Sequence, residues 1–320
     1  MGVVPGYIRS QIPATAGTLV KPKRLRPGDT VALPAPAGVV FNESDFTNMR
    51  EVLESFGLNV IFGEFVRERH GYFSGRDDLR AKDLNRFFSD PAVDGIISVR
   101  GGWGSSRILS YLDFEIIKHN PKIFCGFSDI TTLNLAFLKH CGFVTFHGPN
   151  GASEWTQLTR ESFKTVLMDG EAATFKSVSR VRTIESGIAE GHLIGGNLTI
   201  LTTAIGTSYQ PDTKGSILFL EDISEPPYKI DRMLTHLKAA GMLDGISGFV
   251  FGRCTNCPKK SSPGFTNEEI IRHHIKPLGI PSVMGVDIGH DPDNFTIPLG
   301  IQAKLHADSG EIELAEPAVL

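Results

Sequence analysis

The sequence GIISVRGGWGSSR at residues 95–107 joins a short apolar run to a loop that contains three glycines. The run at 95–99 has the length and composition of a buried strand. A similar arrangement recurs at 122–140, where an apolar run leads through a polar turn into a helical pattern. Strands that alternate with helices of this length predict a parallel sheet covered on both faces. We therefore expect an α/β fold.

The alternation extends along the chain in both directions. Strands are predicted at 31–36, 59–62, 95–99, 122–125, 216–220 and 248–251. Helices are predicted at 46–56, 77–88, 131–140, 160–168, 197–203 and 228–240. The pattern changes after about residue 150. We expect an irregular segment at 1–24, an N-terminal α/β domain at 25–155, a linker at 156–190 and a C-terminal domain at 191–320.

Composition excludes several classes of protein. The 320 residues carry a formal net charge of −4, so the chain has no basic footprint for nucleic acid. It has no run of 18 apolar residues for a spanning helix, and residues 1–24 lack the apolar stretch of a signal peptide. Four cysteines do not form a disulfide framework. We expect a cytoplasmic protein that binds neither nucleic acid nor membrane.

Loops at the carboxyl ends of the strands are the first place to look for a site, because ligands of open α/β sheets bind there. The glycines of the loop at 100–107 can expose backbone N–H groups to a ligand, or can form a tight turn. The loop lacks the lysine of a phosphate loop and the full glycine fingerprint of a dinucleotide site. We expect no cofactor.

Two further loops carry groups suited to hydrolysis. Ser128 stands between a short strand and a helix, where its hydroxyl is a candidate nucleophile, although a helix N-cap is the commoner role for such a serine. Glu221 directly follows an apolar strand and can orient a histidine. Alternatively, the nearby acids Asp222 and Glu225 simply lead into the next helix and are solvated.

His290 is the histidine whose position favours catalysis. It follows an apolar strand in GVDIGHD and precedes a polar loop, so it stands in a position comparable to those of Ser128 and Glu221. A loop histidine by itself is more often structural. His147, in FHGP after another apolar run, can line the same cleft.

A metal site is not expected. Cys254 and Cys257 have CxxC spacing, but a structural zinc site needs two further ligands at motif spacing, and neither Cys125 nor Cys141 provides a second CxxC. Whether Cys254 and Cys257 bond to each other is left open by the sequence.

Taken in order, the segments at the strand ends resemble the LD-carboxypeptidase family, which includes muramoyltetrapeptide carboxypeptidases and microcin C immunity peptidases. The matching segments are VALPAPAG (31–38), GYFSGRDDL (71–79), VRGGWGSSR (99–107), GFSDITTL (126–133), HGP (147–149), GHLIGGNLTIL (191–201), LFLEDISEPPYKIDRMLTHL (218–237) and GVDIGHDPDNFTIPLG (285–300). They cover nearly the whole chain from about residue 25 to 315.

The resemblance implies a catalytic triad of Ser128 as nucleophile, His290 as general base and Glu221 as its orienting partner. It also implies that the backbone N–H groups of Gly102 and Asp129 form the oxyanion hole. The implied fold is a parallel-sheet α/β domain followed by a β-rich domain with helices. The active site would lie at their junction, and the implied assembly is a homodimer.

Two tryptophans and four basic residues are candidates for contact with substrate. Trp103 stands where the family more often has tyrosine, and Trp155 lies where microcin-type members carry a substrate-contacting aromatic residue. The terminal carboxylate of a peptide needs a cation, and the basic residues nearest these loops are Arg100, Arg107, Lys229 and Arg232.

Three functions follow as expectations. The first is release of D-alanine from a murein tetrapeptide by hydrolysis of an LD-amide bond, in peptidoglycan recycling. The second is hydrolysis of a peptidyl-nucleotide antibiotic or another acyl conjugate by the same triad. The third is a binding protein without chemistry, against which the presence of all three triad residues argues.

Overall fold

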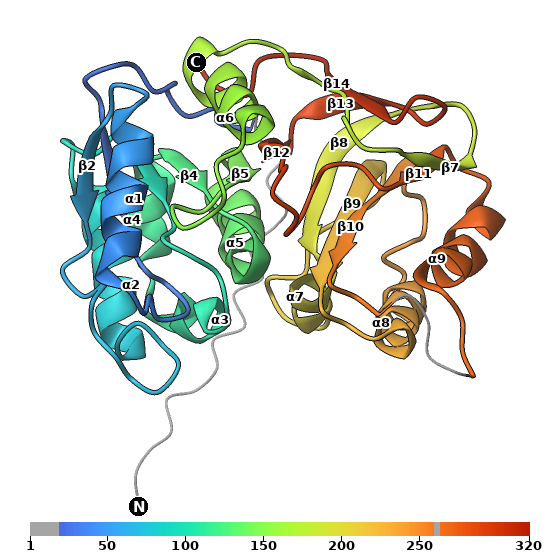
Figure 1. Ribbon diagram of the computed structural model, residues 1–320, viewed down its shortest axis with the longest axis horizontal. Helices are drawn as coiled ribbons and strands as arrows, with labels where there is room; N and C mark the ends of the chain where they lie inside the picture. The colour runs from blue at the N-terminus through green and yellow to red at the C-terminus, as the bar shows by residue number, and fades with distance from the viewer. Residues whose placement is uncertain (1–18, 259–262) are drawn as a thin grey trace, which may run out of the picture.

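Two β-sheets, each with its own helices, lie side by side in the computed structural model, which describes residues 19–258 and 263–320 (Figure 1). One sheet has six strands in the order β12-β5-β4-β3-β1-β2, and the other has eight in the order β6-β14-β13-β8-β9-β10-β11-β7. The α/β architecture with a strand-rich C-terminal half confirms the predicted fold class. Residues 1–18 of the expected irregular segment lie outside the described residues.

The N-terminal sheet is parallel except at one edge. Strands β1 to β5 pair in parallel, and β12 joins β5 in the antiparallel sense. Its strands are β1 (Thr30–Leu33), β2 (Asn59–Phe62), β3 (Gly95–Ile97), β4 (Ile123–Cys125), β5 (Thr145–His147) and β12 (Ile297–Leu299). The helices of this domain are α1 (Glu43–Glu54), α2 (Asp77–Ser89), α3 (Ser105–Ile108), α4 (Phe114–His119) and α5 (Thr131–Cys141). These bounds confirm the predicted alternation at 31–140.

Side chains of successive strand residues face opposite sides of this sheet, so each face has its own core. Ala32, Ile96 and Phe124 pack with α2, α4 and α5 on one side. Val31 and Ile97 belong to the cluster on the other side, which includes α1 and continues without a break into the C-terminal sheet. The two domains therefore share one apolar core.

The C-terminal sheet has four parallel strands at its centre and antiparallel strands on both sides. Strands β8 to β11 are parallel, while β7, β13, β14 and β6 pair in the antiparallel sense. Its strands are β6 (Thr174–Phe175), β7 (Arg182–Glu185), β8 (Ile188–Asn197), β9 (Ser216–Ile223), β10 (Gly248–Thr255), β11 (Ser282–Met284), β13 (Gln302–His306) and β14 (Glu311–Leu314). Its helices are α7 (Leu198–Thr203), α8 (Pro227–Ala239) and α9 (Asn267–Ile275).

The segment expected to be a linker, 156–190, is folded and belongs to both domains. It begins with α6 (Gln157–Lys164) and a π-helical turn at Thr165–Asp169, and it then supplies β6 and β7 to the C-terminal sheet. Phe163 of α6 packs against Phe56 and Trp155, with ring centroids 5.3 and 5.1 Å apart. In return, β12 passes from the C-terminal part of the chain into the N-terminal sheet (Figure 1). The two domains are thus interleaved rather than joined by a free tether.

Strand β9 is almost completely buried and has two acidic residues near its end. Seven of its eight residues, SILFLEDI, are buried. A strand covered on both faces is normally apolar throughout, so two carboxylates near its end must be held by specific partners.

Among the described residues, no helix combines the length and hydropathy needed to cross a bilayer.

Candidate active site

Ser128 lies in the sharp turn between β4 and α5, and its backbone is strained. Its φ angle of +64° is in the left-handed region, which residues other than glycine rarely adopt. The preceding Gly126 has no room for a side chain, since a Cβ there would lie 2.8 Å from Asn150 Oδ1. The alternative role as a helix cap is not observed, because the N-cap of α5 is Ile130 and has no side-chain cap. The turn therefore holds the hydroxyl as a nucleophile elbow would.

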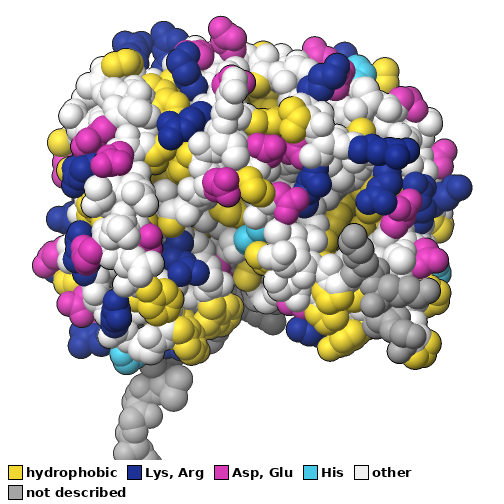
Figure 2. Space-filling model, viewed as in Figure 1, with side chains coloured by type: hydrophobic (Ala, Val, Ile, Leu, Met, Phe, Trp, Pro, Cys, Tyr) yellow, Lys and Arg dark blue, Asp and Glu magenta, His cyan; other side chains and the backbone are white. Residues whose placement is uncertain are grey.

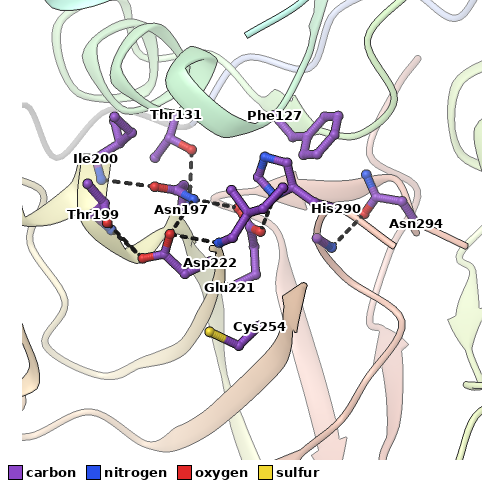
Figure 3. Close-up of polar contacts among 12 residues, drawn as sticks. Phe127, Thr131, Asn197, Thr199, Ile200, Glu221, Asp222, Cys254, His290 and Asn294 are labelled. Carbon is purple, nitrogen blue, oxygen red and sulfur yellow. Dashed lines mark hydrogen bonds and ion pairs between the residues drawn. The ribbon is translucent and has the colours of Figure 1, made fainter. Parts of the chain in front are cut away.

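Glu221 is fully buried near the end of β9, and His290 reaches it from the loop after β11. His290 Nδ1 and Glu221 Oε2 are 2.7 Å apart (Figure 3). Gly289 permits this approach, because a Cβ at its position would lie 2.9 Å from the same Glu221 oxygen. A carboxylate on Nδ1 fixes the tautomer that leaves Nε2 free to accept a proton.

Ser128 and His290 line the same pocket, which has a volume of about 930 Å³. Within the described part of the chain, no hydrogen bond joins the Ser128 hydroxyl to His290; such bonds often form only when substrate is bound. The ring of Phe127 lies 4.7 Å from that of His290 and packs beside it. On the face shown in Figure 2, the surface is hollowed between the two domains and a histidine side chain is visible there.

The buried charges set the protonation states of this pair. Burial alone would favour the neutral imidazole, but the charge of Glu221 and its hydrogen bond raise the pKa of His290 above its ordinary value. Burial likewise opposes ionisation of Glu221, yet the facing His290 holds the pKa of this carboxyl below its ordinary value. The arrangement stabilises an imidazolium next to a carboxylate, which is the state that a general base reaches during catalysis.

Asn197 connects Glu221 to the next acid in the sequence. Its side-chain N–H group donates to Glu221 Oε1 at 3.1 Å and to Asp222 Oδ1 at 3.3 Å (Figure 3). Asp222 also accepts hydrogen bonds from Thr199 through both the backbone N–H and the hydroxyl. Burial and the adjacent charge of Glu221 raise the pKa of Asp222 to about 6. Asp222 is therefore not the solvated helix leader considered as an alternative.

The residues expected to form the oxyanion hole adjoin the serine. A Cβ on Gly101 would lie 3.0 Å from Ser128 Oγ and 3.2 Å from the backbone nitrogen of Asp129. Gly101 O accepts a hydrogen bond from Gly38 N, so the N–H of Gly102 points to the opposite side of that trans peptide. The side chain of Asp129 accepts a bond from Ser105 N at 2.7 Å and ties the two loops together.

The other residues expected to bind substrate do not all lie at the pocket that contains Ser128. Arg100 and Trp155 line the pocket, whereas Trp103 is not among the described residues that line it. Arg232 lines a separate cavity of about 350 Å³ between α7 and α8, so the structure does not bring it to Ser128. His147 is fully buried beneath the site, packed between the rings of Phe127 and Phe219, and burial lowers its pKa to about 4.

Cys254 and Cys257 form a disulfide, with Cα atoms 5.4 Å apart. Cys254 pairs with Asp222 across β10 and β9, so the bond lies one strand away from the buried acids. Cys125 and Cys141 are free and buried. Among the described residues, no group of three or more histidine, cysteine or acidic side chains is placed to hold a metal ion.

Sequence reasoning missed Asn197, which was assigned only to the start of a predicted helix. Its position could have been noticed, because Asn197 follows the apolar segment LIGG just as Glu221 follows LFL. The parallel register that places Asn197 opposite Glu221 is a tertiary feature.

Comparison with known proteins gives the same assignment for both domains. Residues 31–148 match the LD-carboxypeptidase N-terminal domain and residues 190–305 match the LD-carboxypeptidase C-terminal domain. The chain is 38% identical over 292 residues to a protein named probable murein peptide carboxypeptidase from Bacillus subtilis, covering 89% of this chain and 91% of that protein.

Solved structures are similar over most of their length. The muramoyltetrapeptide carboxypeptidase from Oxalobacter formigenes has a TM-score of 0.81 and 34% identity, covering 89% of this chain and 97% of that one. The microcin C7 self-immunity protein MccF in complex with aspartyl sulfamoyl adenosine has a TM-score of 0.88 and 25% identity, covering 94% and 100%. From the two domain matches and the relative at 38% identity, the chain belongs to the LD-carboxypeptidase family, as its motifs predict.

Proposed function

We propose that this chain is a serine carboxypeptidase that hydrolyses an LD-amide bond and releases a terminal D-amino acid, D-alanine, from a murein tetrapeptide. The observation that carries the proposal is the buried ion pair between His290 Nδ1 and Glu221 Oε2, at 2.7 Å, which orients a histidine that lines the same pocket as Ser128. The Bacillus subtilis and Oxalobacter formigenes relatives, named for murein peptides, support this choice of substrate.

The first half of the reaction forms an acyl-enzyme. His290 Nε2 takes the proton of the Ser128 hydroxyl as the serine oxygen attacks the scissile carbonyl. The N–H groups of Gly102 and Asp129 stabilise the oxyanion, each contributing about 3 kcal/mol to transition-state binding. Glu221 stabilises the imidazolium that results. His290 then returns the proton to the leaving amine as the carbon–nitrogen bond breaks.

The second half restores the serine. Water enters the position left by the amino acid, and His290 removes its proton as the oxygen attacks the ester carbonyl. Collapse of this second intermediate releases the shortened peptide and returns the proton to Ser128. No cofactor enters the balance of either step. We further propose that the enzyme acts as a homodimer in the cytoplasm, during peptidoglycan recycling.

A second candidate reaction uses the same groups on a peptidyl-nucleotide or another acyl conjugate. The similarity to MccF bound to aspartyl sulfamoyl adenosine favours it, as does Trp155 on the pocket wall, since an indole face can stack on a base. A binding protein without chemistry is the third possibility. A protein that only binds a ligand does not require a strained serine and a carboxylate-paired histidine in the same pocket.

Mass spectrometry of purified protein incubated with murein tetrapeptide tests the proposal. Wild type should remove one terminal D-alanine, whereas Ser128→Ala should remove none. Ser89→Ala is the matched control, because Ser89 is an exposed residue of α2 that is not among the described residues lining the pocket. A fluorophosphonate should label wild type and Ser89→Ala but not Ser128→Ala.

The other outcomes separate the alternatives. Labelling of Ser128 without loss of D-alanine would contradict the murein substrate and favour a peptidyl-nucleotide conjugate. Neither cleavage nor labelling would favour the binding protein.

A further inference from the structure

A carboxypeptidase must recognise the terminal carboxylate, and chain geometry places that group close to the reacting atoms. In the last residue of a peptide, the carboxylate carbon is only about 2.5 Å from the scissile nitrogen. The cation that binds it must therefore lie next to the serine and the oxyanion loop, not at the far end of the pocket. The inference below rests on the proposed carboxypeptidase function.

Three of the four basic residues near the loops are occupied elsewhere. Arg107 forms an ion pair with Asp77 at 2.7 Å and is not among the described residues that line the pocket. Lys229 and Arg232 line the separate cavity between α7 and α8, where Lys229 pairs with Glu225 at 2.9 Å.

Arg160 does line the main pocket, but its guanidinium is already engaged. Its Nε donates to Trp155 O at 2.9 Å, and its Nη1 donates to Ser55 Oγ at 3.0 Å. The group lies 5.9 Å from the centre of the Phe56 ring, on the side of the pocket formed by α6. The guanidinium of Arg160 is therefore held by structural partners.

Arg100 differs from these residues in both position and partners. Its guanidinium is adjacent to the oxyanion loop, with Nη2 4.0 Å from where a Cβ on Gly102 would be. The neighbouring Gly101 lies close to Ser128, since a Cβ on Gly101 would lie 2.7 Å from Ser128 Cβ. One donor, Nη1, is bound to Val39 O at 3.0 Å, which fixes the orientation of the planar group.

The remaining donors of Arg100 have no anionic partner in the part of the chain that the structure describes. Among the described residues, no carboxylate lies within ion-pair distance of its guanidinium, although the side chain is half-buried in the pocket wall. Half-buried arginines usually pair with an acid, because burial of an unpaired charge is costly. An open fork of donors beside an oxyanion loop is suited to a planar anion.

We propose that Arg100 binds the terminal carboxylate of the substrate and so makes this enzyme act on the last residue of a peptide. Its fork holds both carboxylate oxygens, and the bond to Val39 O keeps the fork in place. A substrate without that carboxylate leaves the guanidinium unpaired in a desolvated wall and is disfavoured. Arg100 is thereby the residue that determines exopeptidase specificity.

The test compares a murein tetrapeptide that ends in D-alanine with the same peptide ending in D-alaninamide. Wild type should cleave the free acid with a kcat/KM about 10- to 100-fold higher, the range expected for a hydrogen-bonded charge pair. Arg100→Gln should lose this preference by lowering kcat/KM for the acid alone. Arg100→Lys should retain part of it, and Arg160→Gln, the control, should keep the full preference.

Binding to the inactive Ser128→Ala protein gives a readout that does not depend on catalysis. Calorimetry should show that Ser128→Ala prefers the acid to the amide, and that the added Arg100→Gln change removes the preference. Equal losses for both peptides would overturn the proposal, because they would show that Arg100 merely supports the loop through Val39. An unchanged preference would also overturn it.

Failure of the proposed function gives a different pattern. If wild type releases neither D-alanine nor D-alaninamide, the proposed reaction is wrong. A preference for the acid that depends on Arg100 in the Ser128→Ala background would still establish the carboxylate subsite. Absence of that preference would contradict both.

Discussion

Glu221 and Asp222 are consecutive residues of strand β9, and the side-chain amide of Asn197 donates a hydrogen bond to each of their carboxylates. Consecutive strand residues normally face opposite sides of a sheet. Both carboxylates are buried, at 0% and 2% exposure, so this shared donor limits the repulsion between them. It also leaves Glu221 Oε2 free for His290.

The charge of Glu221 should control both the rate and its pH dependence. Glu221→Gln should lower kcat by about 10³- to 10⁴-fold, because the imidazolium loses its partner and its tautomer. The acidic limb of the kcat/KM profile should move to lower pH, since Glu221 is what raises the pKa of His290. Rates measured across the acidic and neutral range check this, with Glu225→Gln as control. If the acidic limb of the kcat/KM profile did not move, the pKa of His290 would not depend on Glu221.

Asp222 should contribute stability that is lost as pH rises through the acidic range. The pKa of the Asp222 carboxyl is about 6 in the folded protein, against an ordinary value of 3.8. The folded form therefore holds the proton more tightly than the unfolded chain does. The unfolding free energy therefore falls as pH rises between these two values. Asp222→Asn should remove this component of the slope. Urea unfolding at several pH values measures it; an equal slope in the variant would contradict the assignment.

A methyl group on Gly101 should disable the serine without unfolding the protein. The added Cβ would lie 2.7 Å from Ser128 Cβ, so Gly101→Ala must displace the nucleophile or the oxyanion loop. We expect kcat to fall at least about 100-fold, with loss of fluorophosphonate labelling. Gly71→Ala is the control for backbone strain without a steric clash, because φ at Gly71 is +63° and no atom lies within 4 Å of its added Cβ. Full activity of Gly101→Ala would contradict this prediction, because it would show that the loop at 100–107 moves away from Ser128 without harm to catalysis.

The disulfide between Cys254 and Cys257 should contribute modestly to stability. Replacing both residues by serine should lower the unfolding free energy by about 2 kcal/mol, the chain-entropy value for so short a loop. Alkylation of the unfolded, unreduced protein should modify Cys125 and Cys141 alone. Modification of all four thiols in freshly isolated protein would show that the bond is absent in the cell.

Local sequence patterns were sufficient to predict most of the helices and strands. Strand β2 at Asn59–Phe62 has the predicted bounds, and helix α2 at Asp77–Ser89 extends the prediction by one residue. Both are determined by short-range periodicity and by the residues at their ends, which the sequence displays directly. Ser128 was identifiable as a candidate for the same reason, because a strand-to-helix turn is a local feature.

The strands within the segment predicted as a linker were not predictable, because their local signals are weak. Segment 156–190 reads as polar and β-branched, yet its short strands β6 and β7 are stabilised by pairing with β14 and β11, which come more than 90 residues later. The same is true of β12, which pairs with β5 across the domain boundary. Strand pairing between distant segments depends on the assembled sheet and has no signature in a window of ten residues.

The sequence by itself determined the class of fold, the family, and the strand ends at which Ser128, Glu221 and His290 stand. These follow from periodicity and from motifs in order, which are properties of the chain read locally. The tertiary structure alone decided that Asn197 bridges two buried acids and that Cys254 bonds to Cys257. It also decided which of the basic residues line the pocket, since Arg107 is paired with Asp77 while Arg100 is part of the pocket wall. Charge and burial depend on neighbours in space, and folding brings those neighbours together from distant parts of the chain.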